Sequence, residues 1–564
     1  MKQQLEQAIA GIVAGLFGEL AQTSTVELTW TDDKFGDFAT NVSMHLARQL
    51  GKLPREIAEQ IAERIMAELS DYVADVSVAG PGFINLTLQD SQLVGNLNIP
   101  AAQTLAGKTV LVEYSDPNPF KPLHAGHLYT TLVGDAIARL QEASGASVTR
   151  LNYGGDVGLH VGKSMWAILR ELGGTNPEKL NDIPVAERAT WLGEQYVAGT
   201  AAYEDDPIAK DEIVALNAQV YQIHTQNDHD SPFAQIYWTC RNWSYEYFTK
   251  LYEQLRVTPF DRIIPESEIV PLGLQTVREQ QKNGVYEESD GAVVFKGEAF
   301  GLHTRVFINS KGLPTYETKD VGLLMTKWQD YHFDRSIVIT ANEQQQYMAV
   351  MLKSVEQFAP EEAERSLHVT HGMVKLAGGM KMSSRKGNIA GAVDILQAAA
   401  TANTAATGQD NDDTVVGAVK YAFLKVRIGG DIAYDPVESV SLEGNSGPYL
   451  QYAYARACSI LAKAGNGAHS TSYELLHDLE PGERLLVRKL SEFNEVVTKA
   501  AAELMPHHIC GYLYELAQTF NRFYENNRVL GNEREAVRLS LVASYAQTLH
   551  SGLTLLGIPT PKTM

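Results

Sequence analysis

The chain has 564 residues, of which 44% are hydrophobic and 20% are charged, and its formal net charge is −21. This length exceeds what one hydrophobic core can organise, so several domains are expected. The negative charge argues against loose binding to polyanions, although a local basic face could still bind one. The sequence contains no run of about eighteen apolar residues, so no membrane-spanning helix is predicted.

The cysteine content and the N-terminus indicate a cytoplasmic protein. The three cysteines, Cys240, Cys458 and Cys510, are far apart in the sequence. They predict neither a disulfide framework nor a cysteine-based zinc site, which fits a reducing compartment. Residues 1–16 lack the pattern of a signal peptide and are typical of an amphipathic helix.

The first part of the chain, residues 1–95, is predicted to form a small α+β domain. Ile57, Ile61 and Ile65 recur at helical spacing. Residues 75–88 then have the pattern of two strands joined by a Gly-Pro-Gly turn. A helix and a hairpin of this size can share one small core.

A strand–loop–helix–strand pattern begins the next domain, predicted at 108–400. Residues 108–114 have the apolar run of a buried strand, and 126–141 carry a helical stripe. A further strand is expected at 147–152. This order predicts a doubly wound, Rossmann-like parallel sheet.

The remainder of the chain alternates between helical and strand-forming segments. Residues from about 163 to 282 are rich in helical pattern and are interpreted as an insertion. A polar segment at 408–414 precedes a C-terminal domain, 415–564, that is predicted to be all-helical. Further strands are expected at 292–295, 305–308, 336–340 and 367–374.

His124-Ala125-Gly126-His127 lies where the first strand of this domain should pass into its helix. A helix N-terminus offers free N–H groups and partial positive charge, which suit a phosphate. Gly126 permits close approach of a ligand, and the two imidazoles could donate hydrogen bonds as charge develops at a phosphorus atom. The histidines could instead cap or pack the helix. A metal pair is disfavoured, because no third ligand with zinc spacing is evident.

A second loop, at 381–388, concentrates positive charge between glycines. Its cations and hydroxyls could close over a triphosphate and stabilise the leaving pyrophosphate. A solvated basic turn is the alternative for such a short run of charge. The histidines and this loop, in this order and far apart, together favour adenylate chemistry. The loop residues are Lys381, Met382, Ser383, Ser384, Arg385 and Lys386.

The chain resembles the class I aminoacyl-tRNA synthetases, and specifically the arginyl-tRNA synthetase family. His124 to His127 match the first signature, His-x-Gly-His, and 381–388 resemble the second, Lys-Met-Ser-Lys-Ser. Residues 112–118 resemble the family segment Val-Glu-Phe-Ser-Ser-Pro-Asn. Further similar segments are 36–41 in the N-terminal domain, 152–158, 314–320, and 447–453 at the opening of the anticodon-binding domain.

The resemblance implies an arginine–tRNA ligase that binds ATP with Mg²⁺, L-arginine and tRNA(Arg), without a tightly bound protein metal, and that acts as a monomer. His124, His127 and Lys381 would be catalytic. Ser384 stands where many synthetases have a second lysine, so Arg385 or Lys386 would serve instead. The other ATP-binding residues would be Gly126, Gly155, Asp156, Gly158, Met382 and Ser383.

Arginine recognition requires carboxylates and a flat partner, because a guanidinium is a planar cation with five donors. Tyr316 and Asp320 lie four residues apart and would share a helical face. By resemblance they contact the guanidinium, with Glu288 as a possible second carboxylate. Without the resemblance, Asp320 would be interpreted as a surface ion pair and Tyr316 as a core aromatic. Also by resemblance, the substrate carboxylate would be held by Asn118, and its α-amino group by Glu113 and Gln344.

The C-terminal domain has aromatic and arginine side chains that could stack on splayed bases and contact phosphates. Tyr452 and Arg456 are the candidate tRNA contacts, whereas Phe520 and Phe523 are interpreted as helix-packing core. Two other functions fit the sequence less well. A small-molecule nucleotidyltransferase would need neither terminal domain, and a non-catalytic tRNA-binding paralogue would not need intact histidines and a basic loop.

Overall fold

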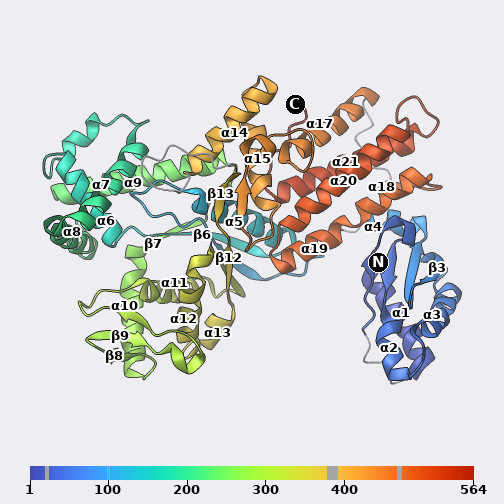
Figure 1. Cartoon of the computed structure of the whole chain (residues 1–564), viewed down its shortest axis with the longest axis horizontal. Coiled ribbons are helices and arrows are strands. Elements are labelled where there is room, and N and C mark those ends of the chain that lie inside the picture. The colour runs from blue at the N-terminus through green and yellow to red at the C-terminus, as the bar shows by residue number, and fades with distance from the viewer. Residues whose placement is uncertain (19–24, 98–99, 101, 378–390, 466–472) are drawn as a thin grey trace.

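The structure, a computed structural model, describes residues 1–18, 25–97, 100, 102–377, 391–465 and 473–564. Three parts follow one another along the chain (Figure 1). An α+β domain at the N-terminus is followed by an α/β domain with helical and small-sheet additions, and then by a helical domain. The expected class and order of domains are confirmed.

The N-terminal domain is built on a four-stranded antiparallel sheet in the order β1-β2-β4-β3. Its hairpin turns at the expected Gly80-Pro81-Gly82, and the isoleucine face of α3 is fully buried. Its elements are α1 (Lys2–Phe17), β1 (Thr29–Trp30), η2 (Asp33–Phe35), β2 (Phe38–Thr40), α2 (Val42–Leu50), α3 (Pro54–Glu68), β3 (Val73–Ala79), β4 (Phe83–Leu88) and α4 (Asp90–Leu97).

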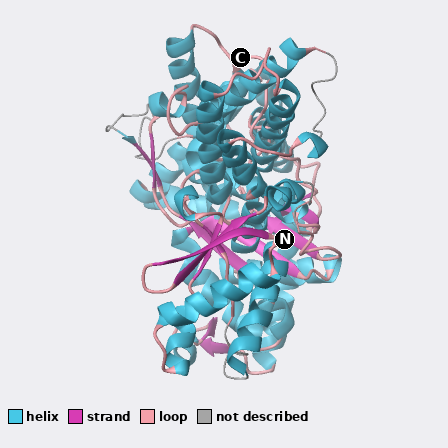
Figure 2. Cartoon of the chain, turned by 90° about the vertical axis from the view of Figure 1, so that its right-hand side faces the viewer, coloured by secondary structure: helices cyan, strands magenta, loops and turns pink. Residues whose placement is uncertain are grey.

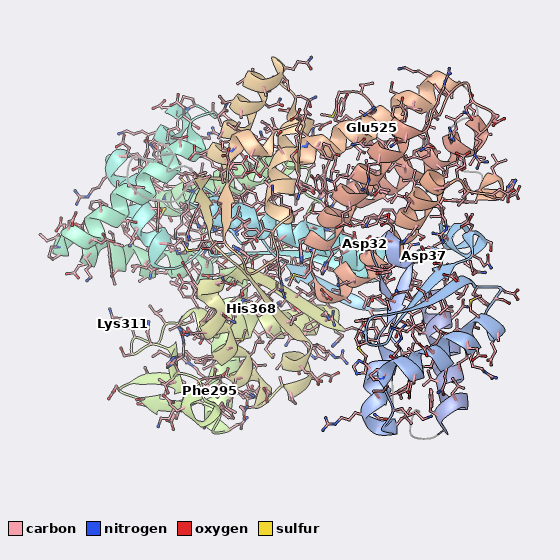
Figure 3. The ribbon with its side chains drawn as sticks, turned by 45° about the vertical axis from the view of Figure 1, so that its right-hand side comes forward. Asp32, Asp37, Phe295, Lys311, His368 and Glu525 are labelled. Carbon is pink, nitrogen blue, oxygen red and sulfur yellow. The ribbon has the colours of Figure 1, made fainter. Side chains whose placement is uncertain are left out.

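An ionic joint attaches this domain to helix α18 (Pro481–Ser491) of the helical domain. Asp37, labelled in Figure 3, is fully buried and lies 2.8 Å from Nη2 of Arg484 and 3.1 Å from Nε of Arg488. Arg484 also pairs with Asp90 at 2.8 Å. Loss of either partner would leave a buried charge unpaired, which is costly. Asp37 therefore holds the N-terminal domain against α18.

The central domain contains a five-stranded parallel sheet in the order β12-β11-β5-β6-β7. The first strand in sequence, β5, is also the middle one, so the chain winds outward from it in both directions. Ligands of such sheets bind at the carboxyl ends of the strands where the winding reverses. The strands are β5 (Thr109–Glu113), β6 (Ser147–Gly154), β7 (Arg262–Pro265), β11 (Arg335–Ala341) and β12 (Ser366–His371), and α5 (Ala125–Ala143) follows β5.

The insertion expected at about 163–282 is mostly helical, but it also contains an edge strand of the main sheet. β7 pairs with β6 and leads into α10 (Glu266–Lys282), whose start reaches the carboxyl edge of the sheet. Four residues are too few for a readable period, so the pattern did not reveal this strand. The inserted helices, at the left of Figure 1, are α6 (Leu159–Glu171), η3 (Pro177–Asp182), α7 (Arg188–Asp205), α8 (Pro207–Thr225) and α9 (Pro232–Gln254).

A small antiparallel sheet in the order β10-β9-β8 and several helices complete this domain. The expected strands at 292–295 and 305–308 are β9 and β10. These elements are β8 (Glu287–Ser289), β9 (Ala292–Phe295), η4 (Gly297–Phe300), β10 (Arg305–Ile308), α11 (Tyr316–Tyr331), η5 (Asn342–Gln344), α12 (Gln345–Glu356) and α13 (Pro360–Glu364).

The C-terminal domain consists of packed helices, which lie in the upper part of Figure 2. Phe520 and Phe523 are buried there, and the ring of Phe520 stacks on Tyr545 at 3.8 Å, so their interpretation as core is confirmed. Before it, β13 (Val374–Leu376) pairs with β14 (Ile432–Tyr434). The helices are α14 (Ala392–Thr407), α15 (Asp412–Leu424), α16 (Pro436–Ser439), α17 (Gly447–Ala464), η7 (Tyr473–Leu475), α18, α19 (Phe493–Glu503), α20 (His507–Asn526) and α21 (Glu535–Leu555).

Helix α5 connects the five-stranded sheet to the helical domain, since α15, α19 and α21 all pack against it. A buried polar cluster lies at this contact. Nζ of Lys420 lies 3.5 Å from Asp135 and donates to the carbonyl of Gly557 at 2.8 Å.

Among the residues that the structure describes, no helix combines the length and the apolar character that crossing a membrane requires.

Candidate active site

A cavity of about 340 Å³ opens at the carboxyl ends of β5, β6 and β11, where the winding of the sheet reverses. Its walls come from the β5–α5 loop, the start of α10, the part of α11 from Tyr316 to Lys327, and helix α12. His368, labelled in Figure 3, contributes from β12. The structure brings the following predicted residues to this cavity: Glu113, Asn118, His124, Gly126, His127, Gly155, Tyr316, Asp320 and Gln344.

The two histidines both cap helix α5 and face the cavity. Nδ1 of His124 accepts from the backbone N–H of Gly126 at 3.1 Å, and Nδ1 of His127 accepts from the N–H of His124 at 3.3 Å. The rings stack with their centroids 3.8 Å apart. Because each Nδ1 is an acceptor, the proton of a neutral ring lies on Nε2. The capping and phosphate-binding interpretations are therefore compatible.

The charge state of both rings follows from their surroundings. Desolvation, reinforced by Lys121, lowers the pKa of His124. Desolvation, with the neighbouring His124, lowers the pKa of His127 well below its usual value. Both rings are thus neutral near pH 7 and present an Nε2–H donor. A Cβ at position 126 would lie 2.9 Å from Cε1 of His124, so any other residue there would displace that ring.

Thr130 and His371, which the sequence analysis did not single out, also hold the first turn of α5 in place. Oγ1 of Thr130 lies 3.0 Å from the carbonyl oxygen of Gly126 and 2.7 Å from Nε2 of His371. His371 ends β12 and is buried. This contact joins the strand that leads toward the basic loop to the helix that carries the histidine signature.

The loop between β5 and α5 is held in an uncommon backbone conformation. Ser115, Asp116 and Phe120 have φ values of 76°, 47° and 67°. Such residues typically cost about 1–3 kcal/mol each and cluster at functional sites. Within this loop, Oδ1 of Asn118 accepts from the N–H of Gly155 at 2.9 Å. Its Nδ2 remains a donor, which suits a carboxylate.

Carboxylates dominate the part of the cavity beside α11. Asp320 is 9% exposed, and desolvation followed by the charge of Glu113 raises its pKa well above the usual value. Tyr316, one turn earlier on α11, also lines the cavity and is 62% exposed. Glu113 is held by Nζ of Lys327 at 2.8 Å. A buried negative site of this kind suits an organic cation.

Glu266 is a cavity residue that the sequence did not reveal. It begins α10 directly after β7, lines the cavity, and pairs with Nζ of Lys319 at 2.5 Å. Its position at a strand end was the available signal, but it lay inside the expected insertion. Glu288, expected as the second carboxylate, lies instead on exposed strand β8 opposite Val293 and does not line the cavity.

Asp156 and Gly158 were predicted to bind ATP, but neither residue lines the cavity. The Asp156 carboxylate is fully buried, and it accepts from the N–H and Oγ of Ser267 and pairs with Arg241 at 3.0 Å. These bonds hold the β6–α6 loop against the start of α10. Gly158 is the N-cap of α6, with a φ of 114° that favours glycine.

The predicted ATP loop, with Lys381, Met382, Ser383, Ser384, Arg385 and Lys386, lies outside the described residues. The candidate RNA contacts Tyr452 and Arg456 are both exposed on α17, one turn apart. The guanidinium of Arg456 lies 4.8 Å from the ring centre of Tyr524. The described residues contain no group of three or more His, Cys, Asp or Glu side chains able to hold a metal ion.

Comparisons with known proteins find relatives of the whole chain. The family models "tRNA synthetases class I (R), catalytic domain", "DALR anticodon binding domain" and "Arginyl tRNA synthetase N terminal domain" match residues 90–434, 450–564 and 1–88. An arginine–tRNA ligase of Porphyromonas gingivalis is 30% identical, with 100% of this chain and 99% of that protein covered. One from a Synechococcus species is 31% identical over 98% of each.

Solved structures match over the same extent. The Thermus thermophilus arginyl-tRNA synthetase superposes with a TM-score of 0.82 at 26% identity, covering 100% of both chains. The Plasmodium falciparum arginyl-tRNA synthetase has a TM-score of 0.81 at 21% identity, covering 100% of this chain and 99% of its own, and supports the fold. The chain belongs to the arginyl-tRNA synthetases, the arginine–tRNA ligases of class I.

Proposed function

We propose that this ligase works in two steps within the described cavity. The carboxylate of L-arginine attacks the α-phosphorus of ATP, which forms arginyl-adenylate and releases pyrophosphate. A ribose hydroxyl of the 3′-terminal adenosine of tRNA(Arg) then attacks the arginyl carbonyl carbon. The ester bond forms as the bond between the carbonyl carbon and the AMP oxygen breaks, AMP leaves, and the hydroxyl proton is released to solvent. ATP enters as its Mg²⁺ complex, a substrate.

His124 and His127 would stabilise the first transition state. What supports this is the pair of neutral Nε2–H donors at the N-terminus of α5, next to backbone N–H groups and the positive end of the helix dipole. Donors fixed before the reaction stabilise charge as it develops, without reorganisation. Gly126 and Gly155 would leave room for the nucleotide. Asp156 and Gly158 would act indirectly, by holding the loop that carries Gly155.

The loop at 381–388 would neutralise the pyrophosphate. Lys381, Arg385 and Lys386 would supply the cations, with Met382, Ser383 and Ser384 adding backbone and hydroxyl contacts. Ser384 replaces the second signature lysine, so one of the two following cations would take its role.

Arginine would lie along the cavity, with its guanidinium between Tyr316 and Asp320 and its carboxylate at Nδ2 of Asn118. Glu113 and Gln344 would face the α-amino end, and Glu266 rather than Glu288 would be the second carboxylate near the guanidinium. Lysine would be rejected. Its compact ammonium group cannot reach all the carboxylate oxygens that bind the planar guanidinium, and those oxygens would stay unpaired in a desolvated site.

Exposed Tyr452 and Arg456 on α17 would contact tRNA bases or phosphates, and we expect the chain to act as a monomer. The single observation that carries the function is the convergence of buried carboxylates and two histidine donors in one cavity at the switch point of the sheet.

The test is ATP-dependent attachment of labelled L-arginine to tRNA(Arg), with labelled lysine as the control. Arginine should be attached and lysine should not. Attachment of lysine, or attachment of arginine without ATP, would contradict the proposal.

A further inference from the structure

The cavity contains two carboxyl groups that form no ion pair with a described residue. Apart from exposed Glu343, four acidic side chains line it: Glu113, Asp116, Glu266 and Asp320. Lys327 pairs with Glu113 and Lys319 pairs with Glu266. Asp116 and Asp320 form no ion pair with any residue that the structure describes. Two buried carboxyl groups therefore remain without a cationic partner, and a cationic ligand could pair with them.

Free L-arginine carries a positive charge at each end, with an α-ammonium group at one end and a guanidinium at the other. Two unpaired carboxylates in one cavity match two separate cationic groups in number and in sign. Asp320, one turn from Tyr316 on α11, is assigned to the guanidinium in the proposed function. That leaves Asp116 and the α-ammonium group.

The position of Asp116 in the chain agrees with this pairing. It lies two residues before Asn118, in the same short loop at the end of β5. Asn118 is the residue assigned to the substrate carboxylate, and in an α-amino acid the ammonium group is attached to the neighbouring carbon. Both side chains line the cavity, so one short loop could serve both groups.

The geometry of Asp116 itself is that of a fixed ligand. Its Oδ1 accepts from the backbone N–H of Tyr153 at 2.8 Å, which orients the carboxylate. Its Oδ2 accepts no hydrogen bond from a described residue. Desolvation, followed by the charge of Glu113, raises its pKa well above the usual value, as expected for a carboxylate that lacks its cation.

We propose that Asp116 is a substrate-binding residue whose carboxylate pairs with the α-ammonium group of L-arginine. In the family segment that residues 112–118 resemble, this position is serine, which cannot supply a charge. In this chain Glu113, the residue otherwise assigned to the α-amino end, already forms an ion pair with Lys327. Asp116 would therefore supply the carboxylate that pairs with the α-ammonium group.

This inference rests on the proposed function, and the test uses ligands that separate the two. Asp116→Asn removes the charge and keeps an oxygen for the N–H of Tyr153. Asparagine also tolerates the φ of 47° found here. Binding of three ligands to the full-length protein is measured by calorimetry: L-arginine, agmatine, which lacks the carboxylate, and 5-guanidinopentanoate, which lacks the α-amino group.

Asp116→Asn should weaken L-arginine and agmatine by about 10- to 100-fold, the loss of one charge-assisted hydrogen bond, and leave 5-guanidinopentanoate nearly unchanged. Asp320→Asn is the matched control and should weaken all three. A melting temperature of Asp116→Asn that is not below that of the wild type would show that the fold is intact.

Equal weakening of all three ligands by Asp116→Asn, or weakening of none, would overturn the inference while leaving arginine binding established. Failure of the wild-type protein to bind L-arginine would instead refute the proposed function. A rise only in the KM for ATP would also overturn the inference, since it would assign Asp116 to the nucleotide.

Discussion

Replacing Asp320 with asparagine should weaken arginine binding strongly and, at the same time, stabilise the ligand-free enzyme. Asp320 is 9% exposed and has no ion-pair partner among the described residues. Removing one partner of a buried, hydrogen-bonded charge pair costs about 2–5 kcal/mol. Because Glu266 provides a second carboxylate nearby, we expect the lower half of that range. This corresponds to a rise of about 30- to 300-fold in the KM for arginine.

The stability effect has the opposite sign. The pKa of Asp320 is raised above its unfolded value of 3.8, so the charged form is disfavoured in the folded protein. This penalty is present above the folded-state pKa and disappears as the pH falls below the unfolded value. The asparagine variant carries no such penalty, so its ligand-free melting temperature at pH 7–8 should exceed that of the wild type by about 2 °C or more.

The same group predicts a pH dependence of substrate binding. Arginine binds the charged carboxylate, so the wild-type KM for arginine should fall as the pH rises through the pKa of Asp320 in the free enzyme, and then level off. The variant should show no such fall. The assay is steady-state aminoacylation over the pH range in which the enzyme is stable, combined with differential scanning calorimetry without ligand. A lower melting temperature together with an unchanged KM would refute the assignment.

The histidines, the domain joint and Glu288 each give a further prediction. His127→Ala should lower kcat by about 10²- to 10³-fold, the usual loss of one oxyanion donor, with little change in the Kd for tRNA; equal losses in both would remove its catalytic role. Asp37→Asn should leave ATP–arginine binding nearly intact but raise the KM for tRNA several-fold in charging assays, because the N-terminal domain loses its anchor on Arg484 and Arg488; a KM for tRNA equal to that of the wild type would show that the joint is dispensable. Glu288→Gln should change the KM for arginine less than about twofold, and a large rise would restore Glu288 to the substrate site.

The sequence predicted most elements whose pattern is long or apolar. The strand at 108–114, the helix after the histidines and the hairpin around Gly80-Pro81-Gly82 agree with β5, α5 and β3–β4 within a few residues. Local periodicity and turn chemistry determine such elements, so one chain segment carries enough information. β7 was missed because a strand of four residues has no readable period and becomes visible only through its pairing with β6.

The candidate site shows the same division. The identity of His124 and His127, and the choice of Asn118, Tyr316 and Asp320, came from motifs in which chemistry and sequence order coincide. Glu266 came only from the structure, because the strand before it had been assigned to the helical insertion.

The sequence by itself determined the family and the order of the domains, and it proposed the reacting groups, because each is encoded in contiguous segments. Only the tertiary structure decided which of the described carboxylates are free. Glu113 and Glu266 are neutralised by Lys327 and Lys319 from α11, whereas Asp116 and Asp320 are not. The physical reason is that a charge is neutralised by its neighbours in space, which here lie up to 214 residues away along the chain.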